Sequence, residues 1–165
     1  MRTDDNGLEL IITEENTRLT PYPDSIGVWT VGTGHRLLPN DSFPEIGITQ
    51  GMVLELLASP AITKPTWKIT PVQVKRLLSK DVESVENFLN FFLRRNNLTI
   101  SQTRFNVLVD FGFNEGVGNL GRLLSHGLDQ VPLQLSKWEY AGGKLLTGLE
   151  NRRNKEISLW NMERV

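Results

Sequence analysis

The sequence predicts an α+β fold that is mainly helical, with one small antiparallel sheet near the N-terminus. Between Leu19 and Leu38, prolines and glycines stand among residues that favour strands, Val28 to Val31 above all. After Pro71, apolar residues recur every three or four positions, the spacing of an amphipathic helix. Because this loop-rich start differs from the helical remainder, we expect a single domain with two lobes flanking a cleft. One lobe spans about 12–70 and holds the sheet; the other spans about 71–165 and includes the N-terminal helix.

The first helix is expected to be capped by Asp5 or Asn6 and to end near Glu15. Its apolar face is formed by Leu8, Ile11 and Ile12. In the strand that follows, side chains alternate between the two faces of the sheet. Val28, Thr30 and Gly32 share one face, and Trp29, Val31 and Thr33 share the other. If Thr30 faces the cleft, Trp29 must face inward.

Hydroxyl residues mark the starts of the next two helices. Thr49 can cap a helix that runs to about Leu57, and Thr70 to Gln73 has the form of a capping box with proline at the first helical position. The apolar stripe that begins there continues without interruption to Arg94 and Arg95. It predicts one long helix that bridges the two lobes.

The rest of the chain is predicted to be helical. Ser101 opens a markedly apolar helix through Phe105 to Phe113, which we expect at the centre of the second lobe. Shorter helices are expected at about 120–125 and 131–138. Thr147 to Glu150 is another capping box, and it is predicted to open a last helix to about Met162.

Composition bounds the classes of function. The 165 residues suffice for one core without covalent staples, and the chain contains no cysteine, which excludes disulfides, thiol catalysis and cysteine-ligated zinc. With 18 basic and 19 acidic residues, the net charge of −1 gives no broad attraction to nucleic acid or an anionic membrane. The N-terminus MRTDDNGLELIITEE lacks a signal peptide's apolar run, and no segment reaches the roughly 18 apolar residues of a membrane span. We expect a soluble monomer.

The stretch from Glu15 to His35 carries the most informative pattern of reactive groups. Glu15 is followed by Asp24 nine residues later and by Thr30 six residues after that. Cleavage of a glycosidic bond needs one carboxylic acid to protonate the leaving oxygen and a second carboxylate across the sugar. Taken singly, the same residues fit an exposed helix end, a turn and an ordinary strand threonine.

Other motifs predict no chemistry. Gly116 to Gly121 satisfies the dinucleotide-binding pattern, yet it follows a helix rather than a strand, so it is interpreted as a helix connection. His35 and His126 are the only histidines, and no zinc-protease motif or serine-nucleophile motif is present. No metal or other cofactor is expected. The pairs Arg94–Arg95 and Arg152–Arg153 are interpreted as solvated helix faces rather than a nucleic-acid patch.

Two ordered sets of residues frame these carboxylates. The first set is Glu15, Arg18-Leu19, Pro21-Tyr22, Asp24, Gly27, Thr30, Gly32 and Gly34-His35. The second set lies downstream and is Phe105, Leu108, Phe111 to Asn114, Gly116, Trp138, Ala141 to Lys144, Gly148-Leu149, Asn151 to Arg153 and Glu156. Together they closely resemble the signature of phage-type lysozymes, glycoside hydrolase family 24, the endolysin muramidases that cut peptidoglycan glycan strands. The resemblance implies a lysozyme-like fold across nearly the whole chain.

The resemblance also implies roles. Glu15 is the expected general acid, Asp24 the carboxylate that stabilises positive charge at the anomeric carbon, and Thr30 a hydroxyl that helps to place a water. Arg152 is the expected neighbour of Glu15. Arg36, Phe113 and Asn114 match positions that line the glycan cleft. Tyr22 either offers its ring to sugar or is buried, and His35 is expected to be structural, paired with a carboxylate.

The resemblance implies cleavage of the β-1,4 bond between N-acetylmuramic acid and N-acetylglucosamine, with inversion as in the better-known family members. The distance between the two carboxyl groups, which separates inverting from retaining sites, is not given by the sequence. Two alternatives remain open: the lysozyme domain of a secreted antibacterial effector, and a catalytically silent glycan-binding module. Without an export signal, the chain would meet periplasmic peptidoglycan only after release or delivery.

Overall fold

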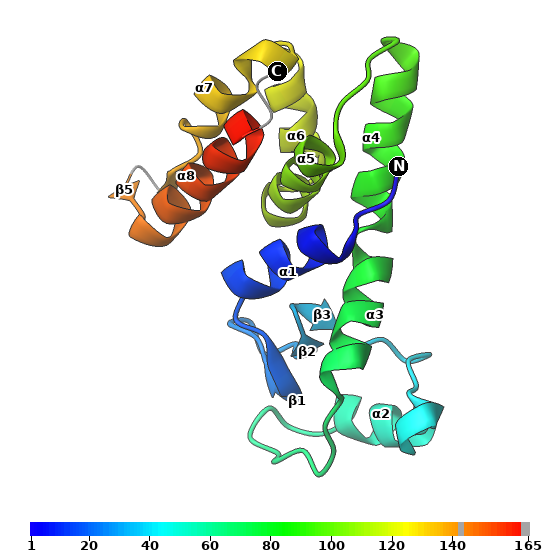
Figure 1. Ribbon diagram of the computed structural model, residues 1–165. Helices are drawn as coiled ribbons and strands as arrows, with labels where there is room; N and C mark the ends of the chain where they lie inside the picture. Colours follow the sequence, from blue (N-terminus) through cyan, green and yellow to red (C-terminus); the bar gives the residue numbers. More distant parts are fainter. Residues whose placement is uncertain (142–143, 163–165) are drawn as a thin grey trace. The chain divides into compact units, whose positions relative to one another are not determined.

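A computed structural model of the protein describes residues 1–141 and 144–162 (Figure 1). They form two compact units, each described by itself below. The sheet unit is Ile11–Asp81, and the helical unit is Met1–Leu10 with the described residues from Val82 onward. Helix α1 (Asp5–Glu14) begins in the helical unit and ends in the sheet unit. The sequence placed the division near residue 70, whereas by packing it follows Asp81.

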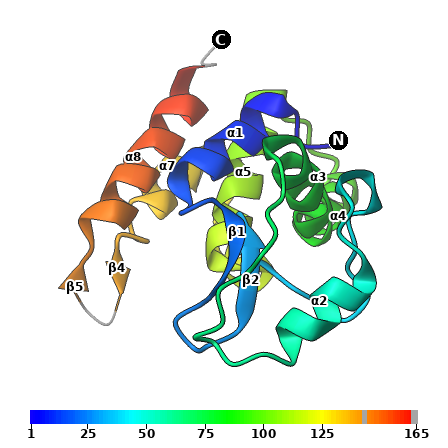
Figure 2. The ribbon, with the colours of Figure 1, turned by 90° about the horizontal axis from the view of Figure 1, so that it is seen from below.

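The sheet unit contains the antiparallel sheet that the sequence predicts. Its strands are β1 (Arg18–Pro23), β2 (Trp29–Gly32) and β3 (His35–Arg36), in the order β1-β2-β3. The β1–β2 hairpin is seen most clearly in Figure 2. Gly27 and Gly34, in the turns between strands, have φ of +83° and +76°, a left-handed conformation that side chains with a Cβ disfavour. These turns set the register that decides which residues share a face.

The rest of the sheet unit is the short helix η1 (Pro44–Ile46), α2 (Gln50–Leu57) and α3 (Pro71–Asp81). The predicted caps are confirmed. The Thr49 hydroxyl accepts from the N–H of Met52 at 3.4 Å. The Thr70 N–H donates to Oε1 of Gln73 at 3.0 Å, and the Gln73 N–H donates to the Thr70 hydroxyl at 3.3 Å. This reciprocal capping box fixes the start of α3.

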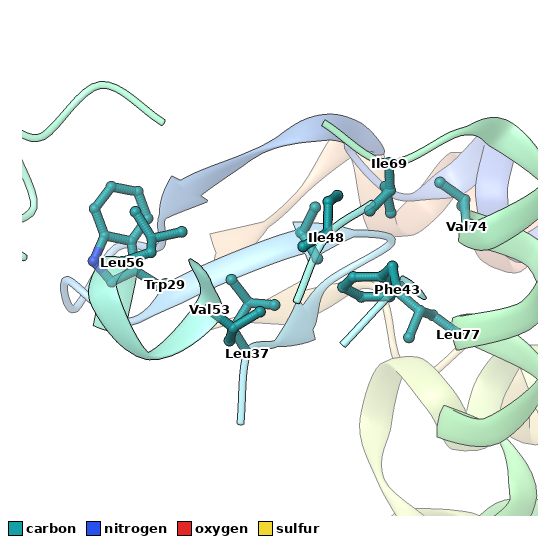
Figure 3. Close-up of a cluster of buried hydrophobic side chains, with 10 residues drawn as sticks. Trp29, Leu37, Phe43, Ile48, Val53, Leu56, Ile69, Val74 and Leu77 are labelled. Carbon is teal, nitrogen blue, oxygen red and sulfur yellow. The ribbon is translucent and has the colours of Figure 1, made fainter. Parts of the chain in front are cut away.

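The core of the sheet unit lies on one face of the sheet, as Figure 3 shows. Trp29 and Val31 of β2 are buried there, as the predicted alternation requires, and the Trp29 indole N–H donates to the Ser59 carbonyl at 3.3 Å. The other buried members are Leu37, Phe43, Ile48, Val53, Leu56, Ile69, Val74 and Leu77. With these side chains anchored, β2 cannot slip by one residue without exposing them. Thr30 is therefore held on the opposite face.

The predicted single helix from Pro71 to Arg95 is wrong: α3 ends at Asp81, and α4 (Glu83–Arg95) begins two residues later. Val82 lies between them with a ψ of −9°, far from the α-helical value of about −42°. Val82 itself is fully buried, so the apolar stripe continues through the break. This is why periodicity alone gave no sign of it.

The helical unit continues with α5 (Gln102–Glu115), α6 (Val117–Leu124), η2 (Leu128–Gln130), α7 (Val131–Leu135) and α8 (Thr147–Met162). The strands β4 (Tyr140–Ala141) and β5 (Lys144–Leu145) pair before α8; Gly142 and Gly143 of the family signature lie outside the described residues. Helix α5 contacts α4, α6 and α8 and is buried along most of its length, which confirms its predicted central place (Figure 1).

Three helix starts in and around this unit test the predicted caps. The Ser101 hydroxyl accepts from the Arg104 N–H at 3.3 Å, as predicted. In α1 the cap is Asp4 rather than Asp5 or Asn6, because its carboxylate accepts from the Gly7 N–H at 3.0 Å. Thr147 is already helical, since the Glu150 N–H donates to the Leu146 carbonyl, so it does not act as the predicted cap. Among the described residues, no helix is long and apolar enough to cross a membrane.

Candidate active site

Asp24 follows β1, and a tight turn fixes its carboxylate. Oδ1 accepts from the N–H groups of Val28 at 2.8 Å and Ile26 at 3.0 Å. The Gly27 N–H donates to the Asp24 carbonyl at 3.0 Å. The hydrogen bond from Val28, with smaller contributions from Ile26, Arg36 and Gly27, lowers the pKa of Asp24 below its ordinary 3.8, although burial acts in the opposite direction. Asp24 is therefore a carboxylate at neutral pH.

Thr30 lies on the same face of the sheet as two other candidate residues. Its cross-strand partners are Tyr22 on β1 and Arg36 on β3, and directly opposed residues in antiparallel strands point to the same side. Asp24, two residues beyond Tyr22, joins this set, since its Oδ2 lies 3.6 Å from Nη2 of Arg36. We call Tyr22, Asp24, Thr30 and Arg36 the reactive face. The register thus brings four of the sequence-predicted residues together.

The hydroxyl of Thr30 has a defined direction. It donates to the Val28 carbonyl at 3.1 Å, and the side chain is only 3 % exposed. A hydroxyl has one hydrogen to donate and two lone pairs to accept with. Since the hydrogen is already used, Thr30 offers an acceptor to any further partner. The Val28 backbone thereby orients both Asp24 and Thr30.

Glu15 is the first residue after α1 and is half-buried. Its N–H donates to the Ile11 carbonyl at 3.0 Å, and its own carbonyl accepts from the Thr17 N–H at 2.9 Å. The backbone of Glu15 is thus tied to the helix on one side and to the turn into β1 on the other. This confirms its predicted place at a helix end; its role as the acid stays a prediction.

Tyr22 and Arg36 are partly and largely exposed, respectively. The guanidinium of Arg18 lies 4.5 Å from the centre of the Tyr22 ring, a cation–π contact that covers one face of the ring. The interpretation of Tyr22 as an ordinary buried tyrosine therefore fails, and a sugar could stack only on the uncovered face.

His35 is held between two carboxylates. Its Nδ1 lies 2.9 Å from Oδ1 of Asp81 at the end of α3, and its Nε2 lies 3.0 Å from Oδ2 of Asp41. Burial opposes the charged imidazole, but the hydrogen bonds and charges of Asp81 and Asp41 outweigh it and raise the pKa of His35. Because both ring nitrogens face carboxylates, this site favours the doubly protonated imidazolium. His35 matches the expected structural histidine paired with a carboxylate.

Arg152 of α8 is held by Asp110 of α5. Its Nη2 donates to Oδ1 at 2.7 Å and its Nε donates to Oδ2 at 3.1 Å, a two-pronged pair in which Arg152 is 5 % exposed and Asp110 fully buried. The predicted solvated face at Arg152–Arg153 is wrong, because Arg153 is fully buried as well. Arg152 pairs with the buried Asp110 carboxylate, and Nε of Arg153 lies 3.1 Å from Oε2 of Glu156. The predicted partnership of Arg152 with Glu15 stays a prediction.

Asn114 and Phe113 lie in the last turn of α5 and are half-buried. Nη2 of Arg153 donates to Oδ1 of Asn114 at 2.8 Å. The guanidinium of Arg153 also stacks on the Phe111 ring, 4.9 Å from its centre. Phe113 is too exposed to be plain core.

Sequence reasoning missed the polar residues behind these groups: Asp41, Asp81, Asp110, Arg153 and Glu156. For Asp110 a signal was present, because a carboxylate in the middle of the apolar helix Phe105 to Phe113 needs a buried cation. Glu156 is fully buried, and burial, together with the neighbouring Asp110 carboxyl group, raises its pKa well above the ordinary range. The spacing of Arg153 and Glu156 on one helix face was a weaker signal.

The helices and the small antiparallel sheet define the class of fold as lysozyme-like. A mutant of phage P22 lysozyme aligns with a TM-score of 0.72 at 22% identity, covering 97% of this chain and 98% of that one. The muramidase domain of SpmX from Asticaccaulis excentricus aligns with a TM-score of 0.70 at 21% identity, covering 97% of each chain.

The particular family follows from sequence. The model of the phage lysozyme family matches residues 13–156, so the chain belongs to that family, glycoside hydrolase family 24. The SAR-endolysin of Enterobacteria phage PA-2 is 29% identical over 157 residues, which cover 90% of this chain and 79% of that protein. The resemblance seen in the motifs is thereby confirmed.

Proposed function

We propose that this member of the phage lysozyme family is a muramidase. It hydrolyses the β-1,4 bond between N-acetylmuramic acid and N-acetylglucosamine in peptidoglycan and so lyses bacterial cell walls. It works as a monomer, without a cofactor, on periplasmic peptidoglycan that it reaches after release or delivery. The observation that carries the proposal is the pairing, on one face of the sheet, of an ionised Asp24 with a Thr30 hydroxyl whose hydrogen is already used.

Glu15 is the general acid. As the bond between the anomeric carbon and the leaving oxygen lengthens, the Glu15 carboxyl passes its proton to that oxygen, and the sugar left behind develops positive charge. The half-buried position at the end of α1 limits its motion and its contact with water. Arg152, itself held by Asp110, orients the Glu15 carboxylate.

The Asp24 carboxylate stabilises the positive charge at the anomeric carbon, and Asp24 and Thr30 together place the attacking water. The water donates one hydrogen to Oγ1 of Thr30 and the other to the Asp24 carboxylate, and its oxygen attacks the anomeric carbon from the side opposite the leaving group. The proton lost by the water passes to Asp24, so atoms and charge balance. Because the water attacks directly, the product inverts its configuration. Support for this arrangement comes from Val28, whose N–H holds Asp24 and whose carbonyl holds Thr30.

The other candidates bind or support. Arg36 neutralises part of the charge of Asp24 between turnovers, while Tyr22 offers its uncovered face to a sugar ring. Phe113 and Asn114 also bind the glycan. His35 ties β3 to the end of α3 and so keeps the register of the reactive face.

Digestion of purified peptidoglycan tests the proposal. New reducing ends of muramic acid, identified by mass spectrometry, are expected with the wild type, and none with Glu15→Gln, which keeps the size of the side chain but has no proton of suitable acidity. Reducing glucosamine ends would make the protein a glucosaminidase. Full activity of Glu15→Gln would show that Glu15 is not the general acid. If the wild type hydrolyses nothing, the protein is a glycan-binding module instead of an enzyme.

A further inference from the structure

Arg153 of α8 carries its guanidinium group at a fully buried position. Its side chain is fully buried, and guanidinium groups are almost never buried without a specific partner. In the part of the chain that the structure describes, Nε and Nη1 make no hydrogen bond, although Nε lies 3.1 Å from Oε2 of Glu156. The hydrogen bond that Arg153 does make is from Nη2 to Oδ1 of Asn114, at 2.8 Å.

Four neighbours restrict the guanidinium. The Phe111 ring lies under it at 4.9 Å, Glu156 lies beside it, and Oε1 of Glu115 lies 4.0 Å from Nη1. The fourth neighbour, Asn114, is half-buried and belongs to the last turn of α5. Because these neighbours fix the position of the guanidinium, the Asn114 side chain must rotate to match Arg153, and Arg153 does not rotate to match Asn114.

This contact decides which end of the Asn114 amide faces Arg153. A guanidinium has five N–H donors and no acceptor, so the amide must turn its oxygen toward Arg153. The amide nitrogen, with two hydrogens, then points away from Arg153. Among the described residues no acceptor takes a hydrogen bond from this nitrogen, which leaves it free to donate.

We propose that Arg153 is a positioning residue that fixes the Asn114 amide, so that its NH₂ group donates to the acetamido carbonyl oxygen of a bound peptidoglycan sugar. The inference rests on the proposed function, and it adds a determinant of specificity. Sugar hydroxyls both donate and accept, so they would bind either orientation of an amide. A carbonyl oxygen only accepts, and a fixed NH₂ group therefore selects for it. The acetamido carbonyl is present on both sugars of the glycan.

The test compares kcat/KM on fully acetylated glycan strands with kcat/KM on the same strands after N-deacetylation. The ratio is insensitive to the folded fraction, so a merely structural role would not change it. The wild type is expected to favour the acetylated strands by about tenfold, the worth of one good hydrogen bond. Asn114→Asp keeps an acceptor for Arg153 but loses the donor. Its ratio is expected to fall to about one or to reverse, since its carboxylate attracts the glucosamine ammonium group.

Variants of Arg153 separate orientation from charge. Arg153→Lys still only donates, and is expected to keep the wild-type preference. Arg153→Gln can turn its own carbonyl toward Asn114 and allow the flipped amide, so an intermediate ratio is expected. Circular dichroism checks that each variant is folded, and Asn114→Asp, at a half-buried site, keeps the test decisive if the Arg153 variants unfold.

The lactyl carbonyl of muramic acid is the other acceptor of this kind. If the wild type treats both strands equally, the acetamido assignment is overturned. An unchanged ratio in Asn114→Asp overturns the whole inference. Affinity of the Glu15→Gln variant for acetylated and deacetylated fragments, by calorimetry, separates the two proposals. If Glu15→Gln binds selectively but the wild type does not hydrolyse glycan, the muramidase proposal is wrong and the Asn114 proposal is supported. If the wild type hydrolyses glycan but binding is not selective, the muramidase proposal is supported and the Asn114 proposal is wrong. If there is no binding and no hydrolysis, both proposals are wrong.

Discussion

Asp110 accepts two hydrogen bonds from Arg152, at 2.7 and 3.1 Å, inside the helical unit. The two residues are 42 positions apart and come from α5 and α8. The pair fixes the direction of the guanidinium proposed to orient Glu15, and it joins the central helix of the unit to the last one.

Asp110→Asn keeps the shape of the side chain but removes the buried charge that Arg152 contacts at 2.7 and 3.1 Å. We expect a loss of about 3–5 kcal/mol in the free energy of unfolding. Urea unfolding followed by circular dichroism measures it. Asp41→Asn, which removes a less buried carboxylate, serves as the milder control. If both variants lose the same free energy of unfolding, the buried Arg152–Asp110 pair is no more sensitive to removal of its carboxylate than the less buried Asp41 contact.

The His35 pairs predict a pH-dependent stability of the sheet unit. Because Asp81 and Asp41 raise the pKa of His35 in the folded chain, the stabilisation is fully present below the unfolded value of about 6.5 and is lost as pH rises through the folded pKa. Asp81→Asn is expected to cost about 1–3 kcal/mol at pH 5.5 and less at pH 9 or above. Thermal melts across this range check it, and a loss that is independent of pH would refute the charged pair.

The lowered pKa of Asp24 predicts the position of the acidic limb of the pH–rate profile. The hydrogen bonds from Val28 and Ile26 come from the backbone, so they persist in any side-chain variant, whereas Arg36 is a smaller cause of the lowered pKa. Arg36→Gln is therefore expected to move the acidic limb of kcat/KM only slightly toward higher pH. A large upward shift in that limb would mean that Arg36, rather than the turn, keeps Asp24 ionised.

Gly112 tests the packing of the helical unit. A Cβ at this position would lie 2.5 Å from Cγ1 of Val85 and 2.9 Å from Cδ2 of Leu120. Alanine gains about 1 kcal/mol of helix propensity but overpacking costs about 1–3 kcal/mol, so Gly112→Ala is expected to destabilise. Gly118 has no heavy atom within 4 Å of such a Cβ, and Gly118→Ala is the matched control, expected to be neutral or stabilising. The opposite order of melting temperatures would contradict this packing.

The sequence allowed local structure to be predicted, because its causes are local. The capping box at Thr70 and Gln73 needs groups three residues apart, and the strand alternation that turns Trp29 inward needs only the period of a strand. The same alternation predicted that Thr30 points away from Trp29, and the turn residues around Gly27 predicted that Asp24 lies in a turn. The side of the strand on which Thr30 lies could therefore be predicted from the chain alone, whereas the roles of Asp24 and Thr30 were inferred from the family resemblance.

The missed features depend on partners far apart in the chain. His35 finds Asp81 46 residues away, and no sequence pattern sets that pairing apart from other carboxylates. Arg153 looked like a solvated residue because its partners, Asn114 and Phe111, approach only when α5 and α8 pack. The break at Val82 was invisible because a buried valine continues the apolar stripe.

The anomeric configuration of the first product tests the central claim, that Asp24 and Thr30 hold the water that attacks the sugar. A proton NMR spectrum recorded within the first minutes of glycan hydrolysis, before mutarotation, distinguishes the two anomers. A direct attack by that water predicts the α-anomer from the β-linked substrate. If the β-anomer forms first, a covalent intermediate precedes the water, and the proposed role of Asp24 and Thr30 is wrong.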